Sequence, residues 1–270
     1  MSYPMKYMLK SMTPVWCLII ALLMFGCDAD DDKAETFVGE SQALGNGTVQ
    51  SWVRTDASGN PEAIGVTLTE AALTNLPTQS AGHKAHAMMG EQPLALPDNV
   101  QTPFNHISVD WNPQGHEPPG LYDLPHFDFH FYMISEAQRD AINPANTDFE
   151  AKAAARPGDA LIPAGYIQTP GAVPRMGAHW LDAATPELNG QVFTKTFIYG
   201  FFDAKMNFFE PMITKAYLES VRTMSGQAVT TPIPQPQQFA QAGYYPTQYS
   251  IRYDAAKKEY TVALEGMTRR

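Results

Sequence analysis

The chain has 270 residues, a formal net charge of −10, seven histidines and two cysteines. This acidic balance, without any lysine- or arginine-rich stripe, argues against a nucleic-acid partner and is compatible with metal cations or cationic ligands. The sequence contains no phosphate-binding loop, dinucleotide fingerprint or nucleophile-elbow motif, so nucleotide and serine-hydrolase chemistry have no support.

The N-terminus has the pattern of a signal peptide with a lipobox-like end. Lys6 and Lys10 precede a short apolar run over residues 15–25, and Gly26 then leads into Cys27. We expect the first 26 residues to be removed and Cys27 to carry a lipid, which would anchor the protein to a membrane on the extracytoplasmic side of the cell envelope. An ordinary secretory signal or an uncleaved anchor is the alternative.

Residues 28–44 begin with the acidic stretch DADDDKAE and are expected to form a flexible tether. Both cysteines, Cys17 and Cys27, lie in the N-terminal segment, so residues 45–270 contain no disulfide and no thiolate ligand. The first 27 residues hold two lysines and no acid, and their removal leaves a net charge of −12. A metal site in the remaining chain must therefore use His, Asp, Glu or backbone oxygen.

Residues 45–270 have the length of a single large domain. The 22 prolines and 19 glycines are scattered through the chain, and strand-like runs outnumber helical ones. This pattern predicts a mainly β fold with a few short helices (α+β), organised as one β-sandwich or barrel-like domain.

In the first half of the chain, strands are predicted at residues 48–55 and 63–69, joined as a hairpin by ASGNPE. A short helix with Thr69 as its N-cap is predicted over residues 70–76. The sequence then predicts a mostly irregular segment at 77–103, a strand at 104–111, a Gly/Pro-rich loop at 112–124 and a strand at 124–135.

In the second half, a helix is predicted over residues 136–155, broken at Asn143-Pro144. Aromatic strands are predicted at 193–202 and 205–209, a helix at 213–224 and a Pro/Gln-rich loop at 228–246. Strands at 249–253 and 260–264 form a closing hairpin.

The segment LPHFDFHFYMIS, residues 124–135, is the strongest sign of a functional site. Side chains on a strand alternate between two faces, so one face receives His126, Asp128 and His130 and the other receives three phenylalanines. Residues two apart lie roughly 6.6 Å apart on a strand, and residues four apart roughly 13 Å. Asp128 can therefore share an ion with either histidine, whereas both histidines together would need a bulge.

Further ligands must come from elsewhere in the chain. His179 lies in a Pro/Gly-framed turn, Glu210 is followed by Pro211, His116 lies in a loop, and His106 lies on the neighbouring predicted strand. The predicted metal ligands are His126, Asp128, His130, His179 and Glu210, with His116 and His106 as secondary candidates.

Such a ligand set suits a divalent transition metal, namely zinc, iron, manganese or copper. A buried structural hydrogen-bond network and metal-free acid–base catalysis remain alternatives. The segment from His83 to Met89 also resembles a soft-metal sequence, although it lies in a stretch predicted to be irregular.

The motifs VDWNPQGHEPPGLYDLPHFDFHFY, PRMGAHW and TKTFIYGFFDAKMNFFEPMIT resemble the TTHB210-like family of uncharacterised bacterial exported proteins. The segments GNPEAIGVTLTEAALTNLP and YSIRYDAAKKEYTVAL resemble the ends of its domain, so the resemblance covers most of residues 45–265. It implies a single β-rich domain that forms rings or other homo-oligomers, and it brings no established enzymatic activity. It also implies a general similarity to cupin-like metal sites, from which this chain departs by placing Asp128 between His126 and His130.

Three functions follow from these observations. The first is a metal-binding exported lipoprotein whose site serves binding or sensing, and the sequence favours it because few acid–base groups exist beyond the ligands. The second is a metal-dependent enzyme, which requires an open coordination position. The third is an envelope structural or assembly protein in which the histidine cluster stabilises the fold.

Overall fold

The computed structural model describes residues 1–2, 33–78, 91–224 and 226–270. Lys33–Arg270 form one compact unit. The predicted signal peptide, the lipidation site Cys27 and the segment from His83 to Met89 lie outside the described residues. No helix in the described part of the chain is long and apolar enough to cross a membrane.

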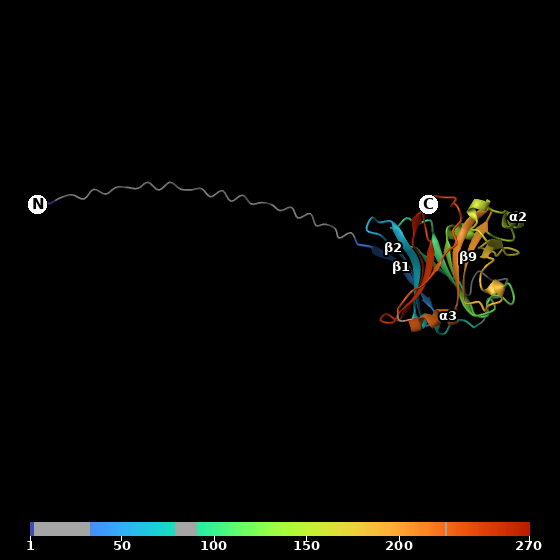
Figure 1. Cartoon of the computed structure of the whole chain (residues 1–270), viewed down its shortest axis with the longest axis horizontal. Helices are drawn as coiled ribbons and strands as arrows, with labels where there is room; N and C mark the ends of the chain where they lie inside the picture. The colour runs from blue at the N-terminus through green and yellow to red at the C-terminus, as the bar shows by residue number, and fades with distance from the viewer. Residues whose placement is uncertain (3–32, 79–90, 225) are drawn as a thin grey trace. The chain divides into compact units, whose positions relative to one another are not determined.

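Two antiparallel sheets lie face to face and form a β-sandwich, with β1 and β2 in one layer and β9 in the other (Figure 1). The six-stranded sheet has the order β1 (Glu35–Leu44), β2 (Gly47–Thr55), β3 (Pro61–Thr69), β14 (Glu259–Glu265), β13 (Gln248–Asp254) and β11 (Val229–Pro232). The seven-stranded sheet has the order β4 (Glu91–Ala95), β5 (His106–Asn112), β6 (His126–Tyr132), β10 (Lys205–Thr214), β9 (Lys195–Phe202), β8 (Ala178–Asp182) and β7 (Tyr166–Gln168). A separate two-stranded sheet pairs β12 (Tyr244–Tyr245) with β15 (Thr268–Arg269).

The helices are short. They are α1 (Glu136–Asp140), α2 (Phe149–Ala154) and α3 (Lys215–Ser220), with 3-10 turns at Glu70–Leu73, Asp159–Leu161, Glu187–Asn189 and Val221–Met224. Helix α2 contacts β9 on the side away from β1 and β2, and α3 lies at one end of the sandwich (Figure 1).

The core between the sheets is built by the period-two pattern of the strands. Phe127, Phe129 and Phe131 are fully buried and join one hydrophobic cluster with Val66 and Val262 from the opposite sheet. Fully burying side chains of this size contributes about 1.5–3 kcal/mol each. The phenylalanines of β6 therefore fix which face of this strand points into the core, and the other face is left for polar residues.

The mainly β sandwich expected from the sequence is confirmed, and neither large sheet closes on itself. The hairpins β2–β3 and β13–β14 are confirmed, as is the break between α1 and α2. The predicted strand at 124–135 is β6.

Several of the boundaries predicted for the tether, strands and loops were wrong. Residues from Glu35 onward, expected in the tether, form strand β1 at the sheet edge, where most side chains are exposed and the sequence is consequently polar. Strand β4 lies in the segment expected to be irregular, and β11 and β12 lie in the expected loop at 228–246.

Two helix predictions also needed correction. The helix expected at 213–224 begins only at Lys215, because Thr214 ends β10 and its hydroxyl accepts a hydrogen bond from the Tyr217 amide. The helix expected at 70–76 is a 3-10 turn without a side-chain cap, because the Thr69 hydroxyl accepts the amide of Thr48 instead, at 2.9 Å.

On the polar face of the seven-stranded sheet, a phenylalanine ring of β10 packs closely against a glycine of β9. Gly200 on β9 lies opposite Phe208 on β10, and a Cβ on this glycine would overlap the Phe208 ring. The ring packs edge-on against His130, with centroids 4.8 Å apart, and also contacts His179 at 5.2 Å. The glycine thus makes room for the aromatic ring that supports two predicted ligands.

We expect Gly200→Ala to destabilise the fold by about 1–3 kcal/mol, because the Phe208 ring would have to move in a packed layer. Chemical denaturation of purified protein measures this loss. Gly158→Ala is the matched control, because no atom lies within 4 Å of a Cβ added there and its φ is −58°. Equal stability of the two variants would contradict the packing argument.

Candidate metal centre

The strand register gathers the polar residues of three adjacent strands on the outer face of the sheet. Asp110 of β5 pairs with Asp128 of β6, and Ser108 pairs with His130. The β6–β10 pairing on either side of Pro211 places Glu210 opposite His130. Polar side chains from distant parts of the chain therefore become neighbours because of sheet pairing.

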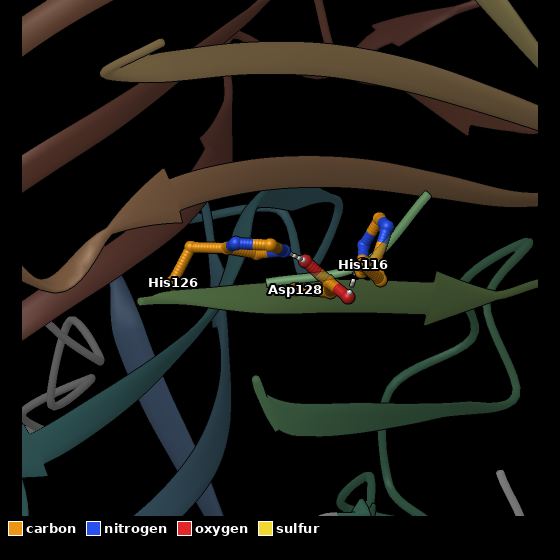
Figure 2. A group of neighbouring side chains, drawn as sticks. All are labelled: His116, His126 and Asp128. Carbon is orange, nitrogen blue, oxygen red and sulfur yellow. Dashed lines mark ion pairs between the residues drawn. The ribbon is translucent and has the colours of Figure 1, made fainter. Parts of the chain in front are cut away.

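The first group, the His116 cluster, consists of His116, His126 and Asp128. Figure 2 shows the Asp128 carboxylate between the two imidazole rings. Nε2 of His126 lies 3.2 Å from one carboxylate oxygen, and Nε2 of His116 lies 3.4 Å from the other. His126 and Asp128 are buried and His116 is half-buried.

The other nitrogen of each ring is held by the backbone. Nδ1 of His126 lies 2.7 Å from the Leu124 carbonyl oxygen, and Nδ1 of His116 lies 2.7 Å from the Glu117 carbonyl oxygen. A carbonyl oxygen only accepts hydrogen bonds, so each Nδ1 carries the proton. In a neutral ring, Nε2 then directs a lone pair at the carboxylate, which is the tautomer that metal-bound histidines use.

His116 is placed by the loop between β5 and β6. The His116 amide donates to the Tyr122 carbonyl oxygen at 3.2 Å, which closes the loop. Gly115 has φ of +72°, and a Cβ there would overlap the Tyr122 backbone. A glycine is therefore required for the turn that brings His116 over Asp128.

The second group, the Glu210 cluster, consists of His130, His179 and Glu210, from strands β6, β8 and β10. One carboxylate oxygen of Glu210 lies 3.6 Å from Nε2 of His130 and 3.8 Å from Nε2 of His179. His130 and Glu210 are each 1% exposed, and His179 is half-buried.

His130 is oriented by a pair of residues on β5. Its Nδ1 lies 3.0 Å from Asp110 Oδ2, and the Ser108 hydroxyl donates to the other Asp110 oxygen at 2.5 Å. This carboxylate–histidine arrangement leaves Nε2 facing Glu210, as in the outer ligand sphere of many metal sites. In the His116 cluster, the side-chain amide of Asn112 holds the Asp128 carboxylate by donating a hydrogen bond to it at 2.7 Å.

Both clusters contain buried polar atoms that lack a hydrogen-bond partner among the described residues. Four of these atoms face the centre of a cluster, namely His126 Nε2, Asp128 Oδ1, His130 Nε2 and Glu210 Oε2, and a fifth, His130 Nδ1, faces Asp110 Oδ2. Leaving such groups unsatisfied costs about 1–3 kcal/mol each. A cation between the nitrogen and oxygen atoms would satisfy all four.

The separations of the facing atoms fit shared ligation. Two ligand atoms about 2.1 Å from one ion, at roughly 95–130° to each other, lie roughly 3.1–3.8 Å apart. The nitrogen–oxygen distances in the two clusters run from 3.2 to 3.8 Å. Each cluster could hold a metal ion, since its three ligand atoms lie within 4.8 Å of one another.

In the His116 cluster, burial and neighbouring charges shift the pKa values of the ligands. Burial raises the pKa of Asp128, but the charges of His126 and His116 outweigh it and hold this pKa well below its usual value. Burial lowers the pKa of His116, but the Asp128 charge and hydrogen bond raise it to about 9. A metal-free His116 cluster therefore keeps the extra proton of His116, which a metal ion would displace.

The three ligands of the Glu210 cluster have pKa values shifted in different directions. Burial lowers the pKa of His130, but Glu210 and Asp110 raise it to about 9. Burial raises the pKa of Glu210 to about 8, although the His130 charge opposes this rise. Burial and the charge of His130 lower the pKa of His179 to about 3. His179 is thus ready to bind a metal at neutral pH without losing a proton.

Both clusters open into one cavity of about 670 Å³. Five of the six ligands line it, namely His116, Asp128, His130, His179 and Glu210. The remaining walls come from strands β4 and β5, the loop between β5 and β6, the loop before β8, and strands β8 and β9. Small-molecule sites typically have volumes in this range.

The structure brings together six of the seven predicted candidates, but in two groups rather than one. His126 and His130 belong to different clusters, as the strand spacing requires. His106 joins neither, because its Nε2 faces Arg139 at 3.2 Å and its ring stacks on Tyr132. The secondary candidate His116 is a full member of the first cluster.

Three supporting residues were not identified as part of the site from the sequence. Ser108, Asp110 and Asn112 alternate along β5, and that alternation was visible in HISVDWN. The sequence could not show that β5 pairs with β6 in the register that sets Asp110 opposite Asp128.

The fold and the site define a β-sandwich with two histidine–carboxylate clusters that could hold metal ions. Residues 56–111 match the model of the TTHB210-like family, described as "Hypothetical protein TTHB210". The match confirms the family resemblance over strand β3, strand β5 and the segment between them. No curated protein and no solved structure matches the chain.

We expect metal affinity to rise with pH up to about 9 and to level off above it. Below these values His116, His130 and Glu210 hold protons in the metal-free protein, because their pKa values are raised to about 9, 9 and 8, and each must lose its proton to bind an ion. For each proton displaced, the metal affinity should fall by up to about tenfold when the pH is lowered by one unit.

Competition titrations against a chromophoric chelator between pH 6 and 8, corrected for protonation of the chelator, measure this slope. His106→Gln should show the same slope as the wild type, because His106 lies outside both clusters. A pH-independent affinity would show that the ligands are already deprotonated.

Proposed function

We propose that this chain is an exported, lipid-anchored protein that binds divalent transition metal ions at the His116 cluster and the Glu210 cluster. The observation that carries the proposal is the geometry of Asp128, whose two oxygens lie 3.2 and 3.4 Å from Nε2 of His126 and His116, while backbone carbonyls hold Nδ1 of both rings. A metal ion between these atoms would take the place of the proton that His116 otherwise keeps.

The ligand types support zinc, iron, manganese or copper over calcium or magnesium. Each cluster offers two imidazoles and one carboxylate. Calcium and magnesium prefer oxygen ligands alone, whereas two histidines and one carboxylate are a common set for zinc and for non-haem iron(II).

Export and anchoring are supported by the N-terminal sequence, where a charged start, an apolar run and Gly26-Cys27 occur in order. The proposed location is the extracytoplasmic side of a membrane. The family resemblance supports a homo-oligomer as the assembled form.

A metal-dependent enzyme is the second candidate function. The specific observation in its favour is the cavity, because a structural metal site is closed by four protein ligands whereas these clusters supply three each and border open space.

We expect purified protein to bind up to two equivalents of a transition metal. His126→Ala should lose the ion of the His116 cluster and His130→Ala the ion of the Glu210 cluster, so each variant should retain about half of the wild-type content. Elemental analysis after dialysis measures the content, and thermal melting checks that the variants are folded.

His106→Gln is the control, since the glutamine oxygen can accept from Arg139 and the residue belongs to neither cluster. Wild-type protein without bound metal after incubation with zinc, iron(II), manganese and copper would refute the proposed sites. Unchanged content in both alanine variants would do the same.

For the anchor, we expect metabolic labelling with radioactive palmitate to mark the wild-type chain and to fail in Cys27→Ala, because the thiol of Cys27 is the proposed attachment point. Cys17→Ala is the matched control and should keep its label. A label that persists in Cys27→Ala would show that the lipid is attached elsewhere or that the signal is of another kind.

A further inference from the structure

We propose that the cavity above the two clusters binds a molecule that has a bidentate oxygen-donor head and an apolar body. This inference rests on the proposed metal sites and deepens them. The head would take open coordination positions on a metal ion, and the body would lie against an apolar wall of the cavity.

The open positions follow from the number of ligands. Each cluster supplies three protein atoms, and transition metals in proteins take four to six ligands. All three residues of the Glu210 cluster line the cavity, so a position left free on its ion faces that space. Two donors of one molecule can reach such an ion from the cavity side.

The apolar wall lies beside the Glu210 cluster. Ile198 is paired with Glu210 in the strand register, and Leu181 of β8 is paired with Ile198. Val173 and Met176, from the loop before β8, line the same cavity. Leu181, Ile198 and Met176 belong to one hydrophobic cluster, with Val173 packed against it.

The two features together define the ligand class. A volume of about 670 Å³ admits a molecule the size of a substituted aromatic ring with room for water. The metal supplies affinity for a chelating head, and the wall supplies affinity for an apolar body.

A matched series of small probes tests this proposal. Full-chain protein loaded with cobalt(II) gives a visible spectrum that changes when a ligand enters the metal's coordination sphere. Benzohydroxamic acid has an apolar ring and a bidentate head, which binds a metal ion as the hydroxamate after releasing its proton to the solvent. Acetohydroxamic acid has the same head without the ring, and benzamide has the ring without a chelating head.

We expect benzohydroxamic acid to bind at least about tenfold more tightly than acetohydroxamic acid, because burial of the ring adds apolar area, and more tightly than benzamide, because two donors reach the ion. Equal affinity for the two hydroxamic acids would overturn the apolar wall. Tighter binding of benzamide would overturn the chelating head.

A pair of variants locates the probe. Val173→Gln replaces an apolar side chain of the wall by a polar, uncharged one and should weaken benzohydroxamic acid at least about fivefold while it leaves acetohydroxamic acid nearly unchanged. Ile167→Gln is the matched control, because Ile167 is 51% exposed and does not line the cavity. Identical affinities in both variants would place the probe outside the cavity and refute the proposal.

Cobalt content, measured in every sample before and after titration, separates the two levels of inference. Protein that takes up no cobalt contradicts the metal sites themselves. Protein that keeps its cobalt but binds no hydroxamic acid leaves the metal sites standing and refutes the ligand class.

Discussion

The His116 cluster depends on one carboxylate, that of Asp128, held in a buried position between two imidazoles. Both rings have their other nitrogen tied to a backbone carbonyl, so neither can turn a donor toward the carboxylate without gaining a proton. A buried charge persists only when it is paired. The fold supplies the amide of Asn112 as one partner and leaves the remaining demand to protons or to a metal ion.

The fold tolerates this buried charge because one face of β6 stabilises the core and the other face carries the ligands. The phenylalanine face is fully buried between the sheets and stabilises the strand independently of the site. The ligand face is covered by loops that also line the cavity. Local electrostatic conflict can therefore exist on one face while hydrophobic packing on the other fixes the backbone.

The sequence predicted the sandwich and the ligand strand because both follow from period-two patterns, as HFDFHFY illustrates. Strand spacing also predicted that His126 and His130 could not share an ion without a bulge, and the structure assigns them to different clusters. What the sequence could not supply was pairing between distant segments. Glu210 meets His130 through the register of β10, and Asp110 orients His130 through the register of β5. The polar edge strand β1 was taken for a tether because edge strands and flexible linkers share a hydrophilic composition.

The three ligands that β6 supplies to the two clusters depend on the alternation of its side chains between the two faces of the sheet. A slip of this strand by one residue would turn His126, Asp128 and His130 toward the core and expose the three phenylalanines instead. Neither cluster could then be lost or moved without the other, and the hydrophobic core would be lost with them. Both clusters therefore depend on one strand register, so a slip of the whole strand removes both at once, whereas a single substitution such as His126→Ala removes only one.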